Sequence, residues 1–244
     1  MTTAGTLIGR MRALPYGTHE DILGGALPLI LAPHPDDEVI GCGGLIATVV
    51  RHAAQPSIVF VTDGSASHPG SRKFPPHALI GLREREAQAA ASILGVRSAN
   101  LHFMRIRDSA VPHDGAGFTA AVERLLDIVA GRDHVLFAPW NCDPHTDHVA
   151  VHKLAVRVGQ IAGLRHLSYP VWGWTLPEAQ ELGDVAIAGW RLDVRRHRKL
   201  KLRALHAHKS QVTDLIDDDP TGFRLTDRTL ETMLSDDEVF LVNV

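Results

Sequence analysis

Residues 29–38 read LILAPHPDDE, a short apolar run that passes directly into one histidine and three acidic residues. A continuous apolar run bounded by prolines is typical of a strand buried on both faces, as in a parallel sheet covered by helices. From Val39 to Val49 the apolar positions then repeat with the period of a helix. The stretch therefore predicts a buried strand, a polar turn at the carboxyl edge of a sheet, and a helix.

The same alternation of apolar runs and helical periodicity continues along the chain. Further strands are predicted at residues 57–62, 101–106 and 134–138. Helical periodicity covers residues 39–49, 80–94, 120–129 and 149–161. This spacing predicts right-handed βαβ units, and hence a Rossmann-like α/β fold with a doubly wound, mostly parallel sheet flanked by helices.

The pattern changes after about residue 165. There we predict extra strands at 168–174, 185–194 and 239–244, and one basic helix over residues 195–209. No internal repeat or Ser/Gly linker interrupts the chain, so residues 1–244 are interpreted as one domain. Residues 1–26 are weakly patterned and are expected to form an irregular N-terminal arm.

The composition of the chain bounds its class. Of 244 residues, 45% are hydrophobic and 22% are charged, which excludes intrinsic disorder and indicates a globular protein with a sizeable core. The formal net charge of −3 gives no global attraction to nucleic acid or to an acidic membrane surface. The eight Lys or Arg residues in 191–209 are therefore interpreted as a solvated helix face.

The sequence also predicts where the protein works. Its longest uncharged stretches, Ile22–Pro33 and Val39–Val50, are shorter than the roughly 20 residues that a membrane span needs. Two cysteines, Cys42 and Cys142, cannot form a disulfide framework and favour a reducing, cytoplasmic location. A homo-oligomer is compatible with all of these features.

The first polar cluster is formed by His34, Asp36, Asp37 and Glu38. It follows a strand of the predicted sheet, at the edge where ligands bind in open α/β folds. Pro35 stiffens the turn. Three neighbouring acidic residues are costly unless a cation or protons balance them. A simpler interpretation, that these acids favour a helix N-terminus, leaves the histidine and the proline unexplained.

A second cluster, WNCDPHTDH over residues 140–148, also follows a predicted strand. Together the two clusters predict a catalytic zinc site with His34, Asp37 and His148 as ligands and one open position, one ion per chain. Two alternatives stay open: His148 could chelate with His152 at i, i+4, and Cys142 could be a ligand, although we expect it to be a packing residue.

Taken together, His34-Pro35-Asp36-Asp37-Glu38 and His145-x-Asp147-His148 resemble the motifs of the LmbE-like (PIG-L) family of zinc-dependent N-acetylglucosaminyl deacetylases. Weaker blocks extend the resemblance over about residues 29–211. They are Val61–Gly64, Arg83-x-x-Glu86, Leu94–Val96 and Lys201-x-x-Ala204-x-x-x-His208-x-Ser210-Gln211.

The resemblance implies roles for the residues of both clusters. His34, Asp37 and His148 are implied to be the zinc ligands, and Asp36 the general base that activates water. His145 is implied to stabilise or protonate the oxyanion, with Asp147 orienting it. Arg83 corresponds to a family residue that contacts the polar substrate.

One position departs from the family pattern. The thiol-biosynthesis members carry a tyrosine where this chain has Asp143. Either the help to the oxyanion comes from elsewhere, or Asp143 contacts a different substrate. Asp143 is therefore predicted, with Arg83, to be a substrate-binding residue.

The sequence therefore predicts a zinc-dependent hydrolase that removes an N-acetyl group from an amino sugar or its conjugate, with a small N-acetylated molecule as its partner. One alternative is a nucleotide- or phosphosugar-binding protein on the same doubly wound sheet, without hydrolysis; the fold alone does not separate the two, but such a protein has no need for His34, Asp37 and His148. The glycine-rich stretch 41–44 is expected to serve close packing. Another is a zinc amidase for a longer acyl or a thiol conjugate. Specificity is expected from loops 65–76 and 107–117 and from the C-terminal third, where Trp172 and Trp174 could stack on a sugar or pack in the core.

Overall fold

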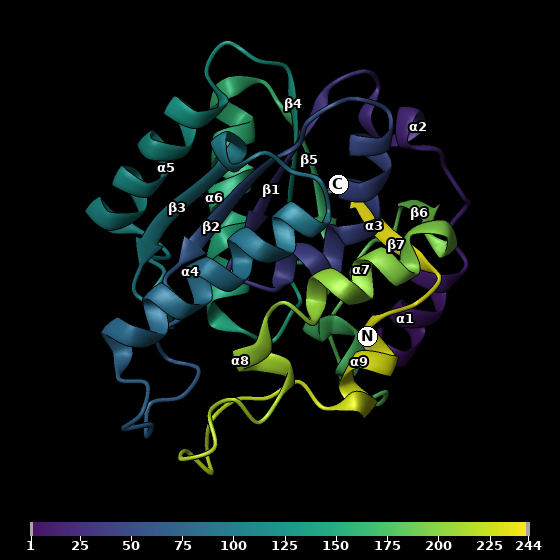
Figure 1. Ribbon diagram of the computed structural model, residues 1–244. Helices are drawn as coiled ribbons and strands as arrows, with labels where there is room; N and C mark the ends of the chain where they lie inside the picture. The colour runs from purple at the N-terminus through teal and green to yellow at the C-terminus, as the bar shows by residue number, and fades with distance from the viewer. Residues whose placement is uncertain (1, 243–244) are drawn as a thin grey trace.

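The computed structural model describes residues 2–242 and contains a seven-stranded sheet in the order β3-β2-β1-β4-β5-β7-β6 (Figure 1). The strands are β1 (Leu27–Ala32), β2 (Ser57–Thr62), β3 (Leu101–Ile106), β4 (His134–Pro139), β5 (Arg165–Tyr169), β6 (Gly189–Asp193) and β7 (Asp237–Val242). The first five are parallel, β7 is antiparallel to β5, and β6 is antiparallel to β7. The α/β fold with a doubly wound, mostly parallel sheet is thus confirmed.

Helices cover both faces of this sheet. They are α1 (Ala4–Arg12), α2 (His19–Leu23), α3 (Asp37–Arg51), α4 (Pro76–Ile93), α5 (Gly115–Val129), α6 (Thr146–Ala162), α7 (Arg198–Leu205), α8 (Lys209–Val212) and α9 (Asp227–Met233). Helices α3, α4 and α7 pack on one face and α5 and α6 on the other (Figure 1).

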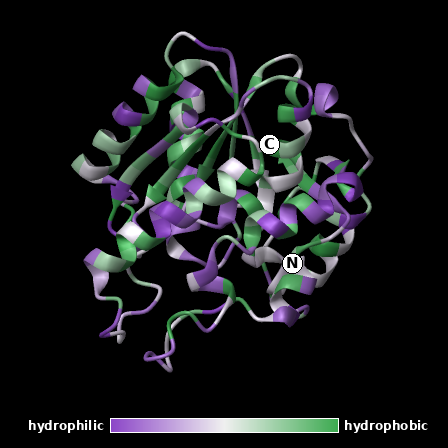
Figure 2. Cartoon of the chain, in the orientation of Figure 1, coloured by the Kyte–Doolittle hydropathy of each residue, from purple (hydrophilic) through white to green (hydrophobic). Residues whose placement is uncertain are grey.

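The strand residues divide between the two faces. On β1, Ile30 and Ala32 belong to the core under α3 and α4, whereas Leu29 and Leu31 belong to the core under α5 and α6. Since both faces are covered, the strands read as continuous apolar runs, and they are correspondingly hydrophobic at the centre of the molecule (Figure 2).

The predicted helices begin earlier than their apolar periodicity. Helix α3 begins at Asp37, α5 at Gly115 and α6 at Thr146. The first turns of α3 and α6 carry acidic residues that complement free backbone N–H groups, and that of α5 begins Gly-Ala-Gly, so these turns lie outside the apolar pattern.

The expectation of an irregular N-terminal arm is wrong, because α1 and α2 lie within residues 1–26. On α1, Ala4, Leu7 and Met11 are fully buried in a cluster with Trp140 and Leu176. Helix α2 begins at a capping box between Thr18 and Asp21. The apolar pattern of α1 and the capping box of α2 are each only a few residues long, and the glycines and threonines around them obscure the helical periodicity.

The C-terminal third departs most from the prediction. In place of one strand over 168–174, β5 ends at Tyr169 and a 3₁₀ helix covers Trp172–Thr175. Strand β6 is shorter than predicted, and β7 begins earlier; residues 243 and 244 lie outside the described part of the chain. The basic helix is divided into a 3₁₀ turn at 195–197, α7 and α8, and α9 was not predicted.

Close packing explains the glycine-rich stretch of α3. A Cβ atom on Gly41 would lie 2.1 Å from the Tyr169 ring, and one on Gly44 would lie 2.3 Å from Val194. Within residues 2–242, every helix is too short or too polar to span a lipid bilayer.

Candidate active site

The two polar clusters meet at the carboxyl edge of the sheet. His34, Asp36 and Asp37 follow β1, and His145 and His148 follow β4. Strands β1 and β4 are neighbours, and the chain leaves them on opposite sides of the sheet. This is the topological switch point at which open α/β sheets bind ligands.

His148 is oriented by two carboxylates. Its Nδ1 lies 2.9 Å from Asp143 Oδ2, and its Nε2 lies 3.3 Å from Asp37 Oδ2. The ring is fully buried, and Nε2 has no hydrogen-bond partner among the described residues. Burial lowers the pKa of His148, but Asp37 and Asp143 outweigh it and raise the pKa to about 9.

His34 is held in a similar way. Its Nε2 lies 3.2 Å from both Asp108 Oδ1 and Asp147 Oδ2, and its Nδ1 lies 3.3 Å from Asp37 Oδ2. Burial lowers the pKa of His34, but the bonds to Asp108, Asp147 and Asp37 raise it well above the ordinary value. The Nε2 atom of the ring thus faces Asp108 and Asp147, and its Nδ1 atom faces Asp37.

Two of these distances, both to Asp37, have the length that two ligands of one divalent ion would have. Atoms that share a tetrahedral ion at bond lengths of about 2.0–2.1 Å lie roughly 3.3 Å apart. Asp37 Oδ2 has this distance to a nitrogen of His34 and a nitrogen of His148, and the buried His148 Nε2 lacks any other partner among residues 2–242. Burial raises the pKa of Asp37, but the His148 and His34 rings outweigh it and lower the pKa. The donor set therefore suits a metal.

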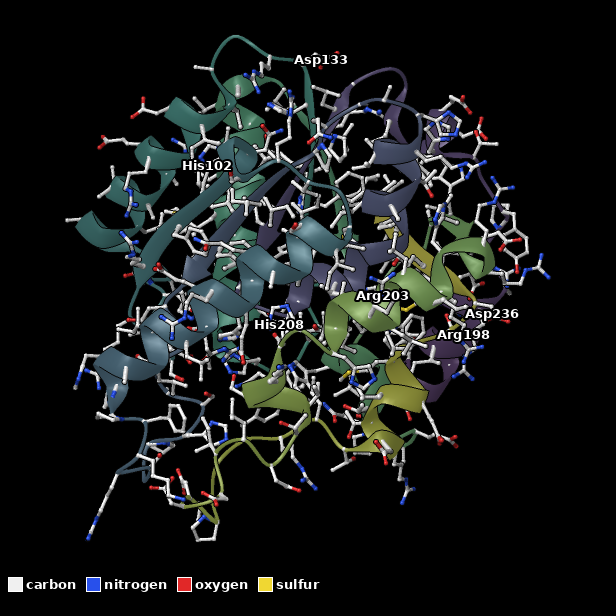
Figure 3. All side chains as sticks on the ribbon, viewed as in Figure 1. His102, Asp133, Arg198, Arg203, His208 and Asp236 are labelled. Carbon is white, nitrogen blue, oxygen red and sulfur yellow. The ribbon has the colours of Figure 1, made fainter. Side chains whose placement is uncertain are left out.

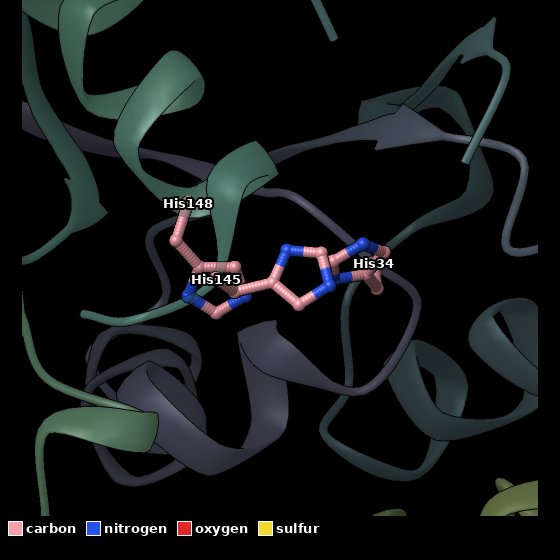
Figure 4. A group of neighbouring side chains, drawn as sticks. All are labelled: His34, His145 and His148. Atoms are coloured by element: carbon pink, nitrogen blue, oxygen red, sulfur yellow. The ribbon is translucent and has the colours of Figure 1, made fainter. Parts of the chain in front are cut away.

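His145 also lies next to these rings (Figure 4). One ligand atom each from His34, His145 and His148 lie within 4.8 Å of one another, as do atoms of His34, Asp108 and Asp147. His145 Nδ1 accepts a hydrogen bond from the backbone N–H of Asp147 at 3.2 Å. Burial and the two neighbouring imidazoles lower the pKa of His145, so the neutral ring carries its proton on Nε2.

The predicted role of Asp147 needs correction. Its carboxylate does not orient His145; it faces His34 and accepts hydrogen bonds from the backbone N–H groups of Ser109 and Val111 at 2.8 and 3.1 Å. The i, i+2 spacing brings the Asp147 backbone, rather than its side chain, to His145. Asp147 thus helps to hold the loop after β3 against the site.

Asp36 occupies a strained position in the pocket. Its φ of 130° and ψ of −29° lie in a region that favours glycine, and its backbone N–H donates to Glu38 Oε2 at 2.8 Å. Such strain persists where the surroundings enforce it, and it is common at functional sites. Burial raises the pKa of Asp36 to about 7, against the lowering effect of Arg83.

Arg83 stands behind Asp36. Its guanidinium donates to the carbonyl groups of Pro35 and Gly64 and lies 3.4 Å from Asp36 Oδ2. The side chain is 2% exposed, yet it lines the pocket. Arg83 therefore supports the turn that carries Asp36, and it also lines the cavity.

Asp143, which we predicted to contact substrate, lies beside His148 and away from the cavity. Its side chain is fully buried and does not line the pocket. Besides bonding His148, it accepts the backbone N–H groups of Val171, Trp172 and Gly173 at 3.1, 3.2 and 2.5 Å. Asp143 thus joins the imidazole to the 3₁₀ helix after β5, and no local sequence signal indicates this.

Two alternative ligands from the sequence are not near the site. His152 Nδ1 lies 3.0 Å from the Pro139 carbonyl, and its ring faces His166 at 5.0 Å. Cys142 bonds Asn141 and packs beside the α1 cluster, as a packing residue does.

Several residues at the site were not assigned by sequence reasoning. Asp108 lines the pocket and contacts His34. His208, which lies between α7 and α8 (Figure 3), places Nε2 3.1 Å from Glu38 Oε1 and so supports the first turn of α3. The position of Asp108 after a strand was an available signal.

The cavity in front of these groups has a volume of about 150 Å³. Its polar lining comes from residues of both clusters and of the neighbouring loops: His34, Asp36, Asp37, Ser67, Arg83, Asp108, Ser109, His145 and Gln211. Its apolar lining comes from Ile40, Trp172, Phe223 and Leu225. Trp172 therefore borders the cavity, whereas Trp174 packs in the α1 cluster.

The fold and site define an α/β protein with a candidate divalent metal centre at its switch point. The family described as GlcNAc-PI de-N-acetylase (PIG-L) matches residues 29–158. The chain is 31% identical over 229 residues to the 1D-myo-inositol 2-acetamido-2-deoxy-alpha-D-glucopyranoside deacetylase of Actinosynnema mirum, covering 76% of this chain and 80% of that relative. The chain belongs to the PIG-L family, which confirms the resemblance stated from its motifs.

Solved structures show the same fold at low identity. The N,N'-diacetylchitobiose deacetylase from Pyrococcus horikoshii has a TM-score of 0.64 at 19% identity, covering 92% of this chain and 85% of that one. GalB, the 4-carboxy-2-hydroxymuconate hydratase of Pseudomonas putida, has a TM-score of 0.68 at 17% identity, covering 90% and 96%. Since a hydratase shares the architecture, the fold alone does not decide the reaction.

Proposed function

We propose that this protein is a zinc-dependent hydrolase that removes the N-acetyl group of an amino sugar or an amino-sugar conjugate. The observation that carries the proposal is the position of Asp37 Oδ2, 3.3 Å from a ring nitrogen of both His34 and His148, with Asp36 beside it in the cavity. His34, Asp37 and His148 are the proposed ligands. A phosphate-binding protein would have no use for this donor set.

The ion supplies one part of the chemistry: when bound, it polarises the amide carbonyl and makes water acidic enough to deprotonate near neutral pH. Asp36 then accepts the proton of the attacking water and returns it to the leaving amine. A bound cation beside Asp36 favours its carboxylate form, so that it can accept a proton near neutral pH. His145, with its proton on Nε2, donates a hydrogen bond to the oxygen on which charge develops.

The substrate class rests on the relatives. One is described as a deacetylase of an acetamido-deoxyglucoside of inositol, and another as a diacetylchitobiose deacetylase. Both names describe N-acetylated amino sugars joined to a second unit, and we transfer only that class to this chain. A cytoplasmic location stays a prediction based on its cysteines, and a homo-oligomer stays compatible with its surface.

The test combines metal analysis with product release. Purified protein should contain about one zinc ion per chain and release acetate from a panel of N-acetylated amino sugars and their glycosides. Chelation should abolish acetate release, and added zinc should restore it. The matched control is Asp37→Ala, which should be metal-poor. Zinc-loaded, folded protein that releases acetate from no member of the panel would contradict the proposal.

A further inference from the structure

Two loops that are distant in sequence are joined beside the cavity. The first is the loop over residues 63–75, after β2, and the second is the loop over residues 213–226, after α8; both project from the same end of the molecule (Figure 1). Three consecutive aspartates of the second loop, Asp217, Asp218 and Asp219, bind the first, and we call them the acidic clasp.

The contacts of the acidic clasp are specific. Asp218 accepts from Ser71 Oγ at 2.7 Å and from the backbone N–H groups of Arg72 and Lys73 at 2.8 and 2.9 Å. Asp219 accepts the N–H of Gly70 at 2.8 Å, and Asp217 pairs with the Lys73 ammonium at 2.6 Å. The two loops therefore form one unit.

This unit determines where Phe223 lies. The Phe223 N–H donates to the Ser67 carbonyl at 2.7 Å, and the Leu225 N–H donates to the Gln211 carbonyl at 2.8 Å. A Cβ atom on Gly222 would lie 2.2 Å from His68 Cδ2, so the two loops pack without space between them. Phe223 and Leu225 are thereby held at the cavity.

Phe223 and Trp172 form an aromatic corner. Their ring centroids lie 5.6 Å apart at an interplanar angle of 78°, an edge-to-face contact. Both are only half-buried, whereas the proposed ligands Asp37 and His148 are 2% and 0% exposed. The metal site is therefore the floor of the cavity, and the aromatic corner lies toward its mouth.

We propose that this aromatic corner binds an apolar group on the amine half of the substrate, remote from the scissile amide, so that the preferred substrate is an amino-sugar conjugate with an apolar aglycone. The inference rests on the proposed function. The proposed ligands are almost fully buried and the corner is half-buried, so a substrate whose acetyl group lies at the floor directs its sugar side toward Trp172 and Phe223. A hydroxyl-rich free sugar would leave these faces without an apolar partner.

The test compares two glycosides of N-acetylglucosamine that differ only in the aglycone, phenyl or methyl. The zinc-loaded wild type should have a kcat/KM about tenfold higher for the phenyl glycoside, a difference of the size expected for one aromatic contact. Phe223→Ala should remove most of this preference, with a smaller loss on the methyl glycoside. Phe223→Leu should give an intermediate result, which also covers the case in which the alanine variant folds poorly.

Two further variants separate position from bulk. Asp218→Ala breaks the acidic clasp without touching the aromatic ring, and it should raise KM for the phenyl glycoside with little change in kcat. Arg224→Ala is the control, because Arg224 is exposed next to Phe223 and pairs with Asp214 rather than lining the cavity. It should leave both glycosides unaffected.

The outcomes that overturn the inference are defined. The first is an equal kcat/KM of the wild type for the two glycosides, and the second is an equal loss of kcat/KM on both glycosides in Phe223→Leu. The third is a preference of the wild type for N-butyryl over N-acetyl substrates that Phe223→Leu removes, because this result would assign the aromatic corner to the acyl side of the substrate. If neither glycoside releases acetate, the proposed function fails. The aromatic corner is then tested by itself, by calorimetric binding of the phenyl glycoside to Asp36→Asn and to the double variant Asp36→Asn, Phe223→Leu. Equal binding by both proteins would overturn it.

Discussion

The parallel part of the chain, residues 27–162, and the C-terminal third, residues 165–242, contribute different chemistry to one cavity. The parallel part supplies the acidic and imidazole groups, which follow β1, β3 and β4, and the guanidinium of Arg83, which lies on α4. The C-terminal third supplies the apolar wall with Trp172, Phe223 and Leu225. The reacting groups thus depend on the sheet edge, whereas the shape of the cavity depends on segments added to it.

The C-terminal third also stabilises helix α3 of the parallel part. Lys201 donates to the Ile40 carbonyl at 2.7 Å and pairs with Glu238 at 2.6 Å. Glu238 in turn accepts the backbone N–H groups of Gly44 and Leu45. Helix α3, which begins at Asp37, is therefore held by charged groups from the other region.

The largest expected effect separates catalysis from metal binding within the parallel part. Asp36→Asn should keep its zinc and lose about 10²- to 10⁴-fold in kcat, because it removes the proton acceptor but not a ligand. Asp37→Ala should instead lose metal affinity, with activity partly recovered in excess zinc. Zinc content and turnover of both variants are the measurements. A zinc-free Asp36→Asn beside a loaded Asp37→Ala would reverse the two assignments.

A large effect on stability is expected in the C-terminal third. Lys201→Met should lower the free energy of unfolding by about 3–5 kcal/mol, because it leaves the buried Glu238 carboxylate without its cation. Urea unfolding measures this loss, and Lys201→Met combined with Glu238→Gln should recover part of it. Lys199→Met, exposed on the same helix, is the control. Equal free energies of unfolding for Lys201→Met and Lys199→Met would show that the Lys201–Glu238 pair does not support α3.

A smaller effect is expected at the junction of the two regions. Asp143→Asn should weaken zinc affinity by about 10- to 100-fold, because it disturbs the carboxylate that orients His148. The ranking of substrates should not change, since Asp143 does not reach the cavity. Competition with a chromogenic chelator and the glycoside panel test both statements. Normal zinc affinity together with a changed ranking of substrates would instead assign Asp143 to substrate binding.

The smallest predicted effect concerns pH. Burial, and to a lesser extent His152, lower the pKa of His166 on β5 from 6.5 to about 3. Between these two pH values the unfolded chain binds a proton at His166 that the folded chain does not bind. The free energy of unfolding is therefore unaffected by this group above pH 6.5 and decreases as the pH falls below it. At pH 5 this costs about 2 kcal/mol. His166→Gln should flatten this part of the pH profile of unfolding; an unchanged slope would contradict the prediction.

The success of the sequence-based prediction differs between the regions for a physical reason. Strand β2 has the predicted bounds, because a strand covered on both faces carries a continuous apolar run, here Ile58–Val61. Strand β3 also has the predicted bounds, although it lies at the edge of the sheet and carries the exposed Arg105. Trp172 was assigned to a strand, but the bonds of residues 171–173 to Asp143 hold a 3₁₀ helix there. A partner about 30 positions away leaves no periodicity to detect.

By itself, the sequence determined the strand–helix alternation, the two polar clusters and the chemical character of their side chains. These are local properties, because an apolar run and the turn after it lie within a few residues. Only the tertiary structure decided that Asp143 bonds His148 and does not line the cavity, that Asp147 faces His34, and that the acidic clasp holds Phe223 at the cavity. Each of these depends on which elements become neighbours, and that is set by packing over the whole sheet rather than by any single segment.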